Sequence, residues 1–159
     1  MLNPIEERIL IELQENCRIS FQDLGNVVGL SSSSCHKRVK SLETSGIIES
    51  YSANLDAGKL GLNTSAYVRI FLRDQTQETM RAFEAALWEH DQIMECALMT
   101  GEYDYLLRVL CVDLPAFERF QSEVISNLPG VARVQSNIPL RMVMRRSSAP
   151  LKSLIGPDY

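Results

Sequence analysis

The chain has 159 residues, of which 45% are hydrophobic and 23% are charged, and its formal net charge is −4. This composition is typical of a globular protein with one domain or two small ones. No apolar run is long enough to cross a membrane and no secretory leader pattern is present, so we expect a cytoplasmic protein with no membrane partner. Residues 1–50 contain five Lys or Arg against seven Asp or Glu, which argues against non-specific coating of nucleic acid.

Three short helices are predicted in this N-terminal part. The first spans Pro4 to Glu15, and Ser20 is expected to cap the second, with Asp23 three residues later as in a capping box. Their apolar positions recur at helical spacing and comprise Ile5, Ile9, Leu10 and Leu13 in the first helix and Leu24, Val27 and Val28 in the second.

The third helix is the centre of the pattern and lies between Leu30 and Gly46. Ser31 is a suitable N-cap, and Gly46 can adopt the positive φ that often ends a helix. One side of this helix is apolar, through Cys35, Val39 and Leu42, and the other side carries hydroxyl and basic groups. Since a tight turn containing a glycine joins it to the second helix, we predict a helix-turn-helix whose third helix enters the major groove of DNA. An ordinary solvent-exposed helix is the alternative interpretation.

Residues 47–53 are β-branched or aromatic at strand-like spacing, so we expect a short strand or wing here, with Ile48 and Tyr51 pointing inward. The glycine-containing stretch that follows is the expected domain boundary. We therefore expect a DNA-binding domain at residues 1–50, a short strand and linker at 51–63, a second domain at 64–146 and a C-terminal tail at 147–159.

In the predicted second domain the sequence pattern indicates both helices and strands. Alternation from Thr64 predicts a strand, Asp74 or Thr76 can cap a helix to about Glu89, and Gly101 can turn a hairpin between two further strands. A helix from Asp113 or Pro115 and a last strand from Val131 towards Arg145 complete the order βαββαβ, which is a ferredoxin-like unit. The predicted fold class is thus α+β, with a winged-helix-like helix-turn-helix followed by a ferredoxin-like domain.

Aromatic residues in this domain divide into two groups. At helical spacing, Phe83, Trp88, Phe117 and Phe120 are expected in the core. Tyr67 and Phe71 lie on the second face of the first strand, and an apolar second face indicates a partner sheet and hence a dimer.

The four cysteines, Cys17, Cys35, Cys96 and Cys111, form no C-x-x-C pair and have no histidine at ligand spacing. We expect buried free thiols, with no metal site and no disulfide framework. No catalytic motif is present either, so we predict no catalytic residues and no enzyme.

Several phrases together resemble the Lrp/AsnC (feast/famine) transcriptional regulators along nearly the whole chain. They are IEERILIELQENCRIS, DLGNVVGLSSSSCHKRVKSLETSGII, MTGEYDYLLRVLCVD and LPGV at Leu128 to Val131. The resemblance implies a regulator that binds double-stranded DNA as a homodimer, often assembled into an octamer or another ring of dimers. It also implies no cofactor but a small-molecule effector, usually an amino acid.

Two groups of site residues follow. The expected DNA contacts are Ser32, Ser33, His36, Lys37, Arg38 and Lys40, since hydroxyls and Lys can contact base edges and basic groups can bind phosphate. By resemblance, the effector lies near the Gly-x-x-Asp hairpin, where a glycine turn exposes N–H donors for a carboxylate and a carboxylate can accept from an ammonium. The expected effector residues are Met99, Thr100, Gly101, Tyr103, Asp104 and, from the position of a family threonine, Ser136.

An enzyme of the same architecture is the alternative. Sirohaem decarboxylases look similar to these regulators yet act on a tetrapyrrole, which requires histidine and basic residues in the C-terminal domain. Only His90 lies there, and the third helix keeps its basic side.

Overall fold

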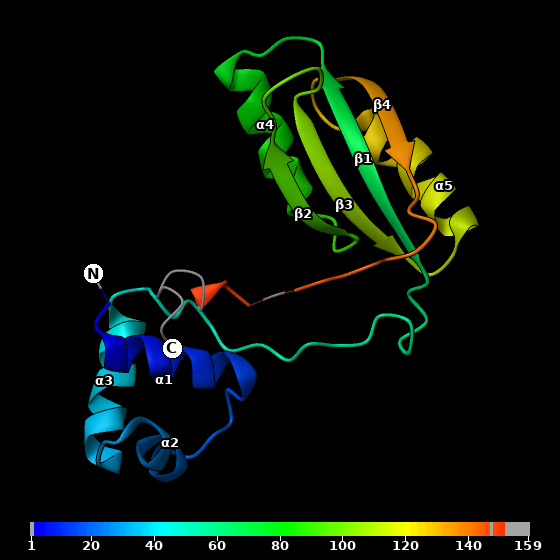
Figure 1. Cartoon of the computed structure of the whole chain (residues 1–159). Helices are drawn as coiled ribbons and strands as arrows, with labels where there is room; N and C mark the ends of the chain where they lie inside the picture. Colours follow the sequence, from blue (N-terminus) through cyan, green and yellow to red (C-terminus); the bar gives the residue numbers. More distant parts are fainter. Residues whose placement is uncertain (1, 147, 152–159) are drawn as a thin grey trace. The chain divides into compact units, whose positions relative to one another are not determined.

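A computed structural model describes residues 2–146 and 148–151 (Figure 1). The chain forms two compact units, one from Met1–Asn54 together with Met144–Tyr159 and one from Leu55–Val143. This division differs from the predicted boundaries at the C-terminal end, because the described residues after position 143 belong with the N-terminal unit. Among the described residues, no helix has the length and apolar character needed to span a membrane.

The N-terminal unit has three helices, α1 (Pro4–Glu15), α2 (Phe21–Val28) and α3 (Ser32–Thr44). Each begins at a polar cap: Asn3 forms a capping box with Glu6, Ser20 accepts from the Asp23 amide, and Ser31 accepts from the Ser34 amide. These caps satisfy N–H groups that have no partner inside the helix. The predicted helices and the caps at Ser20 and Ser31 are confirmed, and Gly46 has the expected positive φ of 74°.

The core of this unit is built from all three helices. Its buried members include Ile9, Leu24 and the α3 stripe Cys35, Val39 and Leu42. Val27 was expected in the core but is 42% exposed, because its side chain lies on the outer side of α2. Its backbone carbonyl accepts a hydrogen bond from the Arg8 guanidinium of α1.

A segment from the far end of the chain completes this core. Leu151 is only 9% exposed and belongs to the same cluster as Ile9 and Leu24. The Gln14 side-chain amide, with its oxygen and nitrogen placed to satisfy both groups, donates to the Ala149 carbonyl at 3.1 Å and accepts from the Ala149 amide at 2.9 Å. Residues 149–151 therefore belong structurally to the helical unit.

Leu151→Ala is expected to destabilise the helical unit by about 2 kcal/mol, the low end for a truncated core leucine, since Leu151 lies at the rim of the cluster. Slower-exchanging amides of α1 to α3 should become less protected in hydrogen exchange, while those of the other unit should not. Leu140→Ala is the matched control, because Leu140 is fully exposed. Equal protection in both variants would contradict this role.

The strand expected after α3 is not formed, and among the described residues positions 47–63 contain no strand at all. A strand needs a neighbouring strand for its hydrogen bonds, and the chain supplies none here. Ile48 does face the helical core as expected, whereas Tyr51 is 48% exposed.

The second unit has the elements β1 (Thr64–Leu72), α4 (Gln77–Leu87), β2 (Ile93–Leu98), β3 (Tyr105–Cys111), α5 (Leu114–Glu123), the short 3₁₀ turn η1 (Ile125–Asn127) and β4 (Val131–Asn137). The strands form one antiparallel sheet in the order β2-β3-β1-β4. Both helices lie on the same face of the sheet (Figure 1). The predicted βαββαβ order is thus confirmed.

Two expectations for this unit were wrong. The last strand ends at Asn137 rather than near Arg145, because Pro139 lacks the N–H that a ladder needs. Phe83, Phe117 and Phe120 are buried as expected, but Trp88 is 90% exposed. It follows the last residue of α4 and so lies beyond the stripe that faces the sheet.

The thiols also differ from expectation in part. Cys35 and Cys111 are buried and free, while Cys17 and Cys96 are exposed. Nowhere in the described part of the chain do three His, Cys, Asp or Glu side chains meet as a metal site.

Candidate DNA-binding face and ligand hairpin

The turn between α2 and α3 determines how α3 is presented. The Gly25 carbonyl accepts from the Leu30 amide at 2.9 Å, and Gly29 adopts a φ of 74°. A Cβ on Gly25 would lie 2.5 Å from the Leu30 carbonyl oxygen, closer than two such atoms can approach. The two helices therefore meet as they do only because residue 25 has no side chain.

The outer face of α3 carries the predicted contact residues. Ser32, Ser33, His36, Lys37 and Lys40 are all exposed, on the side opposite Cys35 and Val39. Ser33, Lys37 and Lys40 lie four and three positions apart and so form one row along the helix. This row is an exposed polar and basic side of α3.

The basic residues differ in their surroundings. The Arg38 guanidinium lies 3.5 Å from the Glu6 carboxylate of α1, and its side chain is 35% exposed. Lys40 Nζ lies 3.2 Å from Glu43, and among the residues described Lys37 forms no ion pair. Because an exposed pair such as Lys40–Glu43 contributes only about 0–1 kcal/mol, a phosphate can replace Glu43 as the partner of Lys40.

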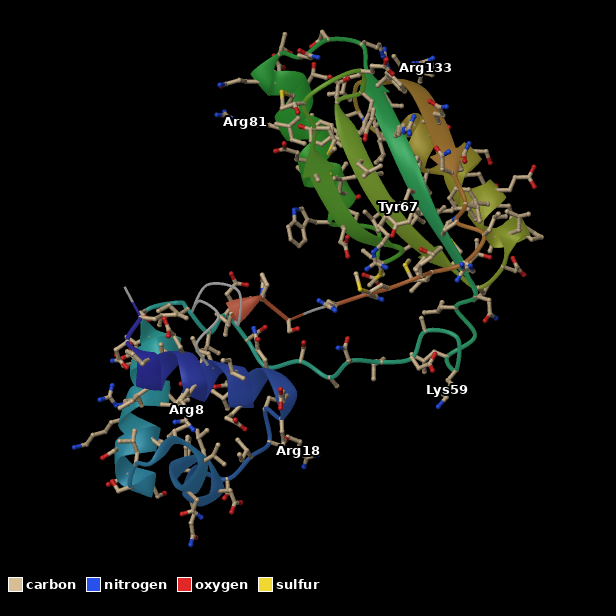
Figure 2. All side chains as sticks on the ribbon, viewed as in Figure 1. Arg8, Arg18, Lys59, Tyr67, Arg81 and Arg133 are labelled. Carbon is tan, nitrogen blue, oxygen red and sulfur yellow. The ribbon has the colours of Figure 1, made fainter. Side chains whose placement is uncertain are left out.

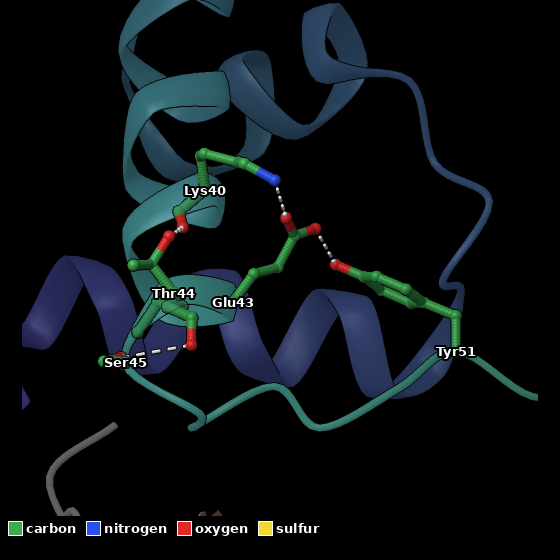
Figure 3. Close-up of polar contacts among 6 residues, drawn as sticks. Lys40, Glu43, Thr44, Ser45 and Tyr51 are labelled. Carbon is green, nitrogen blue, oxygen red and sulfur yellow. Dashed lines mark hydrogen bonds and ion pairs between the residues drawn. The ribbon is translucent and has the colours of Figure 1, made fainter.

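Glu43 also binds the segment after the helix (Figure 3). The Tyr51 hydroxyl donates to one oxygen of Glu43 at 3.1 Å while Lys40 contacts the other. The hydrogen bonds from Lys40 and then Tyr51 lower the pKa of Glu43. They favour the carboxylate, so the contact is present above the ordinary carboxyl pKa and is lost as pH falls through the lowered value. This pair was not predicted from the sequence, since eight positions separate Glu43 from Tyr51.

His36 packs against α2. The centre of its ring lies 5.0 Å from the centre of the Phe21 ring in an edge-to-face arrangement, which aromatic pairs prefer. The contact fixes the ring on the outer side of the helix pair.

In the second unit, the hairpin between β2 and β3 contains most of the expected effector residues. Gly101 has a φ of 127°, and a Cβ there would meet nothing within 4 Å in this chain. Met99 and Asp104 close the hairpin through the Met99 amide and Asp104 carbonyl at 2.8 Å. The Tyr103 ring contacts Phe71 at 6.3 Å and lies 5.2 Å from the Arg69 guanidinium carbon.

Asp104 has a structural role beside any ligand contact. One carboxylate oxygen accepts from the Leu72 amide at 2.7 Å and the other from the Gln75 side-chain amide at 2.6 Å. Both bonds join the hairpin to the end of β1. The role of Gln75 was not predicted, because no sequence pattern indicates a contact over 29 positions.

Ser136 lies apart from the hairpin. Its hydroxyl donates to the Gln121 side chain of α5 at 2.6 Å, so it faces the helices. The structure therefore groups Met99 to Asp104 but not Ser136.

The open face of the sheet, on the side away from α4 and α5, is aromatic and basic. Figure 2 labels two of its members, Tyr67 on β1 and Arg133 on β4. The Arg133 guanidinium carbon lies 3.7 Å from the centre of the Phe71 ring. Arg108 is only 8% exposed and pairs with Glu95 at 2.8 Å. Cation–π contacts of this kind are strengthened when a surface loses water.

The histidine that tetrapyrrole chemistry would need is packed into the unit. The His90 ring lies 5.8 Å from that of Phe120. The His90 ring therefore packs against α5.

Comparison with known proteins covers both units. Residues 2–49 match the family model for winged helix-turn-helix DNA-binding domains, and residues 65–149 match the model for the Lrp/AsnC ligand binding domain. The chain is 38% identical over 150 residues to the Bkd operon transcriptional regulator of Pseudomonas aeruginosa, a match that covers 94% of this chain and 98% of the relative. It is 32% identical over 152 residues to the DNA-binding transcriptional activator DecR of Escherichia coli, covering 96% and 100%.

A solved structure of a transcriptional regulator from Neisseria meningitidis in complex with L-methionine has the same fold. Its TM-score is 0.91 at 32% identity, and the match covers 97% of this chain and 99% of that one. The helix-turn-helix unit, the ligand-binding unit and these matches together show that the chain belongs to the Lrp/AsnC family of transcriptional regulators.

Proposed function

We propose that this regulator binds a specific DNA sequence through the α3 row Ser33, Lys37 and Lys40, with Ser32 and His36 beside it. The observation that carries the proposal is that this row is exposed and basic while the opposite side of α3 is buried in the helical core. Arg38 acts mainly by joining α3 to Glu6 of α1 and is at most a phosphate contact. The lysine substitutions that test this are argued in the Discussion.

We infer that the regulator is a homodimer formed through the open face of its sheet. Tyr67 and Phe71 are half-buried there already, and the Ser65 hydroxyl is buried without a hydrogen-bond partner among the described residues. A second sheet packed on this face would cover the aromatic rings. Each helix-turn-helix contacts only a few base pairs, so a dimer needs a pseudo-palindromic operator with half-sites about one helical turn, or a multiple of it, apart.

Tyr67→Arg is expected to separate the dimer, because it adds a charge to a face that already has Arg69, Arg108 and Arg133. The sedimentation mass should fall to that of one chain, and the protected operator should shrink or disappear in a footprint. Tyr67→Phe keeps the ring and should leave both unchanged. A Tyr67→Arg protein that remains dimeric and footprints the full operator would contradict this assignment.

The effector we propose is an amino acid held at the hairpin of residues 99–104. The L-methionine complex of the Neisseria relative supports this class, as does the open space beside the glycine turn at Gly101, where backbone N–H groups can donate to a carboxylate. Asp104 is the candidate acceptor for the ammonium group, in addition to its bonds to Leu72 and Gln75.

Asp104→Ala is expected to lower the affinity for an active amino acid by roughly 1.5 to 3 kcal/mol, which is about ten- to a hundred-fold. Calorimetric titration is the measurement, after melting shifts across the twenty amino acids have identified a ligand. Asp104→Ala also removes the two structural contacts of the carboxylate, to the Leu72 amide and to Gln75. Gln75→Ala is the control, since it removes one of these contacts but keeps the carboxylate that would bind the ligand. Gly101→Val should abolish the response. Equal affinities for wild type and Asp104→Ala would show that Asp104 only shapes the turn.

A further inference from the structure

The carboxylate of Glu43 is shared between two donors at the end of α3 (Figure 3). Lys40 Nζ lies 3.2 Å from Glu43 Oε2, and the Tyr51 hydroxyl donates to Glu43 Oε1 at 3.1 Å. Lys40 belongs to the row proposed to contact DNA, whereas Tyr51 lies on the segment that follows the helix. One side chain therefore connects a DNA-contact residue to the chain outside α3.

The segment after α3 is fixed to the helix at its start. The Leu42 carbonyl accepts from the amides of Ile47 and Ile48 at 3.0 and 3.2 Å, and Ile48 packs against the helical core. Residues 49–54 are exposed and form neither helix nor strand. The hydrogen bond from Tyr51 brings this exposed stretch back onto α3, so its strength affects how well the stretch is ordered.

The two partners of Glu43 differ in how easily they can leave it. The Lys40 side chain is 70% exposed, against 32% for Glu43, so the lysine can turn towards a phosphate while the carboxylate stays against the helix. Glu43 would then lose its cationic partner in the presence of a polyanion. The Tyr51 hydroxyl remains as its donor and holds the negative charge beside residues 49–54.

The bond from Tyr51 is stronger in that state than in the free protein. A hydrogen bond to a carboxylate gains from the negative charge, and in the free protein Lys40 neutralises part of that charge. Once Lys40 has left, Tyr51 interacts with the whole charge of Glu43. A contact that is stronger in the DNA-bound state favours DNA binding, and DNA binding strengthens the contact by the same free energy.

We propose that Tyr51 is a positioning residue for DNA binding, which holds Glu43 when Lys40 leaves it for a phosphate. DNA binding in turn orders residues 49–54 on α3. This role rests on the proposed function only in that Lys40 must contact DNA. It connects that contact to a stretch of chain that ends where the second unit begins, at Leu55.

The first test is the operator affinity of the full-length protein. Tyr51→Phe should weaken binding by about two- to five-fold, the effect of an exposed charged contact, and more at low salt than at high salt. The fold should be kept, because the ring is retained and Tyr51 is 48% exposed. Tyr67→Phe, which removes a hydroxyl from the second unit, is the matched control and should leave the affinity unchanged.

A double-variant cycle shows whether Tyr51 acts through Glu43. Glu43→Ala should strengthen operator binding by about two- to five-fold, since it frees Lys40 and removes a negative charge near the DNA. Glu49→Ala removes the same charge from an exposed position of the following segment and should have a smaller effect. Tyr51→Phe should have no further effect in the presence of Glu43→Ala or of Lys40→Ala, because each removes the exchange of partners.

A second readout is hydrogen exchange of the backbone amides of residues 49–54. Saturating operator should slow their exchange in the wild-type protein, because the Tyr51–Glu43 bond is then at its strongest. The same concentration of bound operator should not slow it in Tyr51→Phe.

Equal operator affinities for wild type and Tyr51→Phe would overturn the proposal. A loss that persists in the presence of Glu43→Ala would do the same, since Tyr51 would then contact the DNA itself. Equal slowing of exchange in wild type and Tyr51→Phe would show that the DNA, and not this hydrogen bond, orders residues 49–54. If Lys37→Ala weakens binding and Lys40→Ala does not, the role of Tyr51 is excluded while α3 remains the DNA contact. If neither lysine matters, both proposals fail.

Discussion

Replacing Lys37 and Lys40 together by alanine is expected to weaken operator binding by roughly 1 to 3 kcal/mol for each lysine that contacts a base edge. If the contacts are to phosphates instead, the slope of log affinity against log salt should flatten by about one unit per lysine. Both side chains are exposed, so neither substitution should unfold the helical unit. A titration of labelled operator at several salt concentrations separates the two kinds of contact.

The two lysines should differ when they are replaced singly. Lys40 must leave Glu43 before it binds DNA, whereas Lys37 has no ion pair to break among the described residues. Lys37→Ala should therefore have the larger effect. Lys59→Ala removes the same charge from the part of the second unit that precedes β1, outside α3, and is the matched control (Figure 2). Unchanged affinity and salt slope in the double variant would exclude α3 as the DNA contact.

Gly25→Ala is expected to abolish operator binding by a different route. Its methyl group would be forced against the Leu30 carbonyl oxygen, and since that oxygen belongs to the backbone the turn between α2 and α3 must open. Overpacking of this kind costs about 1 to 3 kcal/mol and occasionally more. The helical unit is small, so this is a large part of its stability.

Hydrogen exchange of peptides from α2 and α3 is the appropriate measurement, because the single tryptophan lies in the other unit and does not report on the helices. Gly58→Ala is the control: its φ is not positive, and its Cβ would meet the Asp56 and Asn63 side chains at ordinary contact distances of 3.4 and 3.9 Å. Protection of α2 and α3 that is the same in Gly25→Ala and wild type would mean that the turn adjusts without cost.

Local features of the sequence were sufficient to predict the helices and the order in which helices and strands follow one another. Ser20, Ser31 and Gly46 act within one turn of their own position, so caps and ends could be predicted from neighbouring residues. The same is true of the apolar stripe of Cys35, Val39 and Leu42, and hence of the exposed side of α3. The family resemblance followed because these local phrases occur in one order.

Features that depend on distant residues required the tertiary structure. The bond between Asp104 and the Leu72 amide, and the place of Leu151 in the helical core, join positions that no periodicity connects. The strand expected near Tyr51 did not form for the same reason, since strand propensity forms a strand only where a second strand lies beside it. The last strand ends at Asn137 because Pro139 cannot donate to the ladder.

Trp88 shows the limit most clearly. Helical spacing predicted that it lies in the core with Phe83, yet α4 ends just before it and the side chain remains in solvent. The sequence by itself thus determined the fold class, the caps and the exposed side of α3, because these depend on residues within a few positions of one another. Which apolar residues stay exposed was decided only by the tertiary structure, because burial depends on what the rest of the chain places against them.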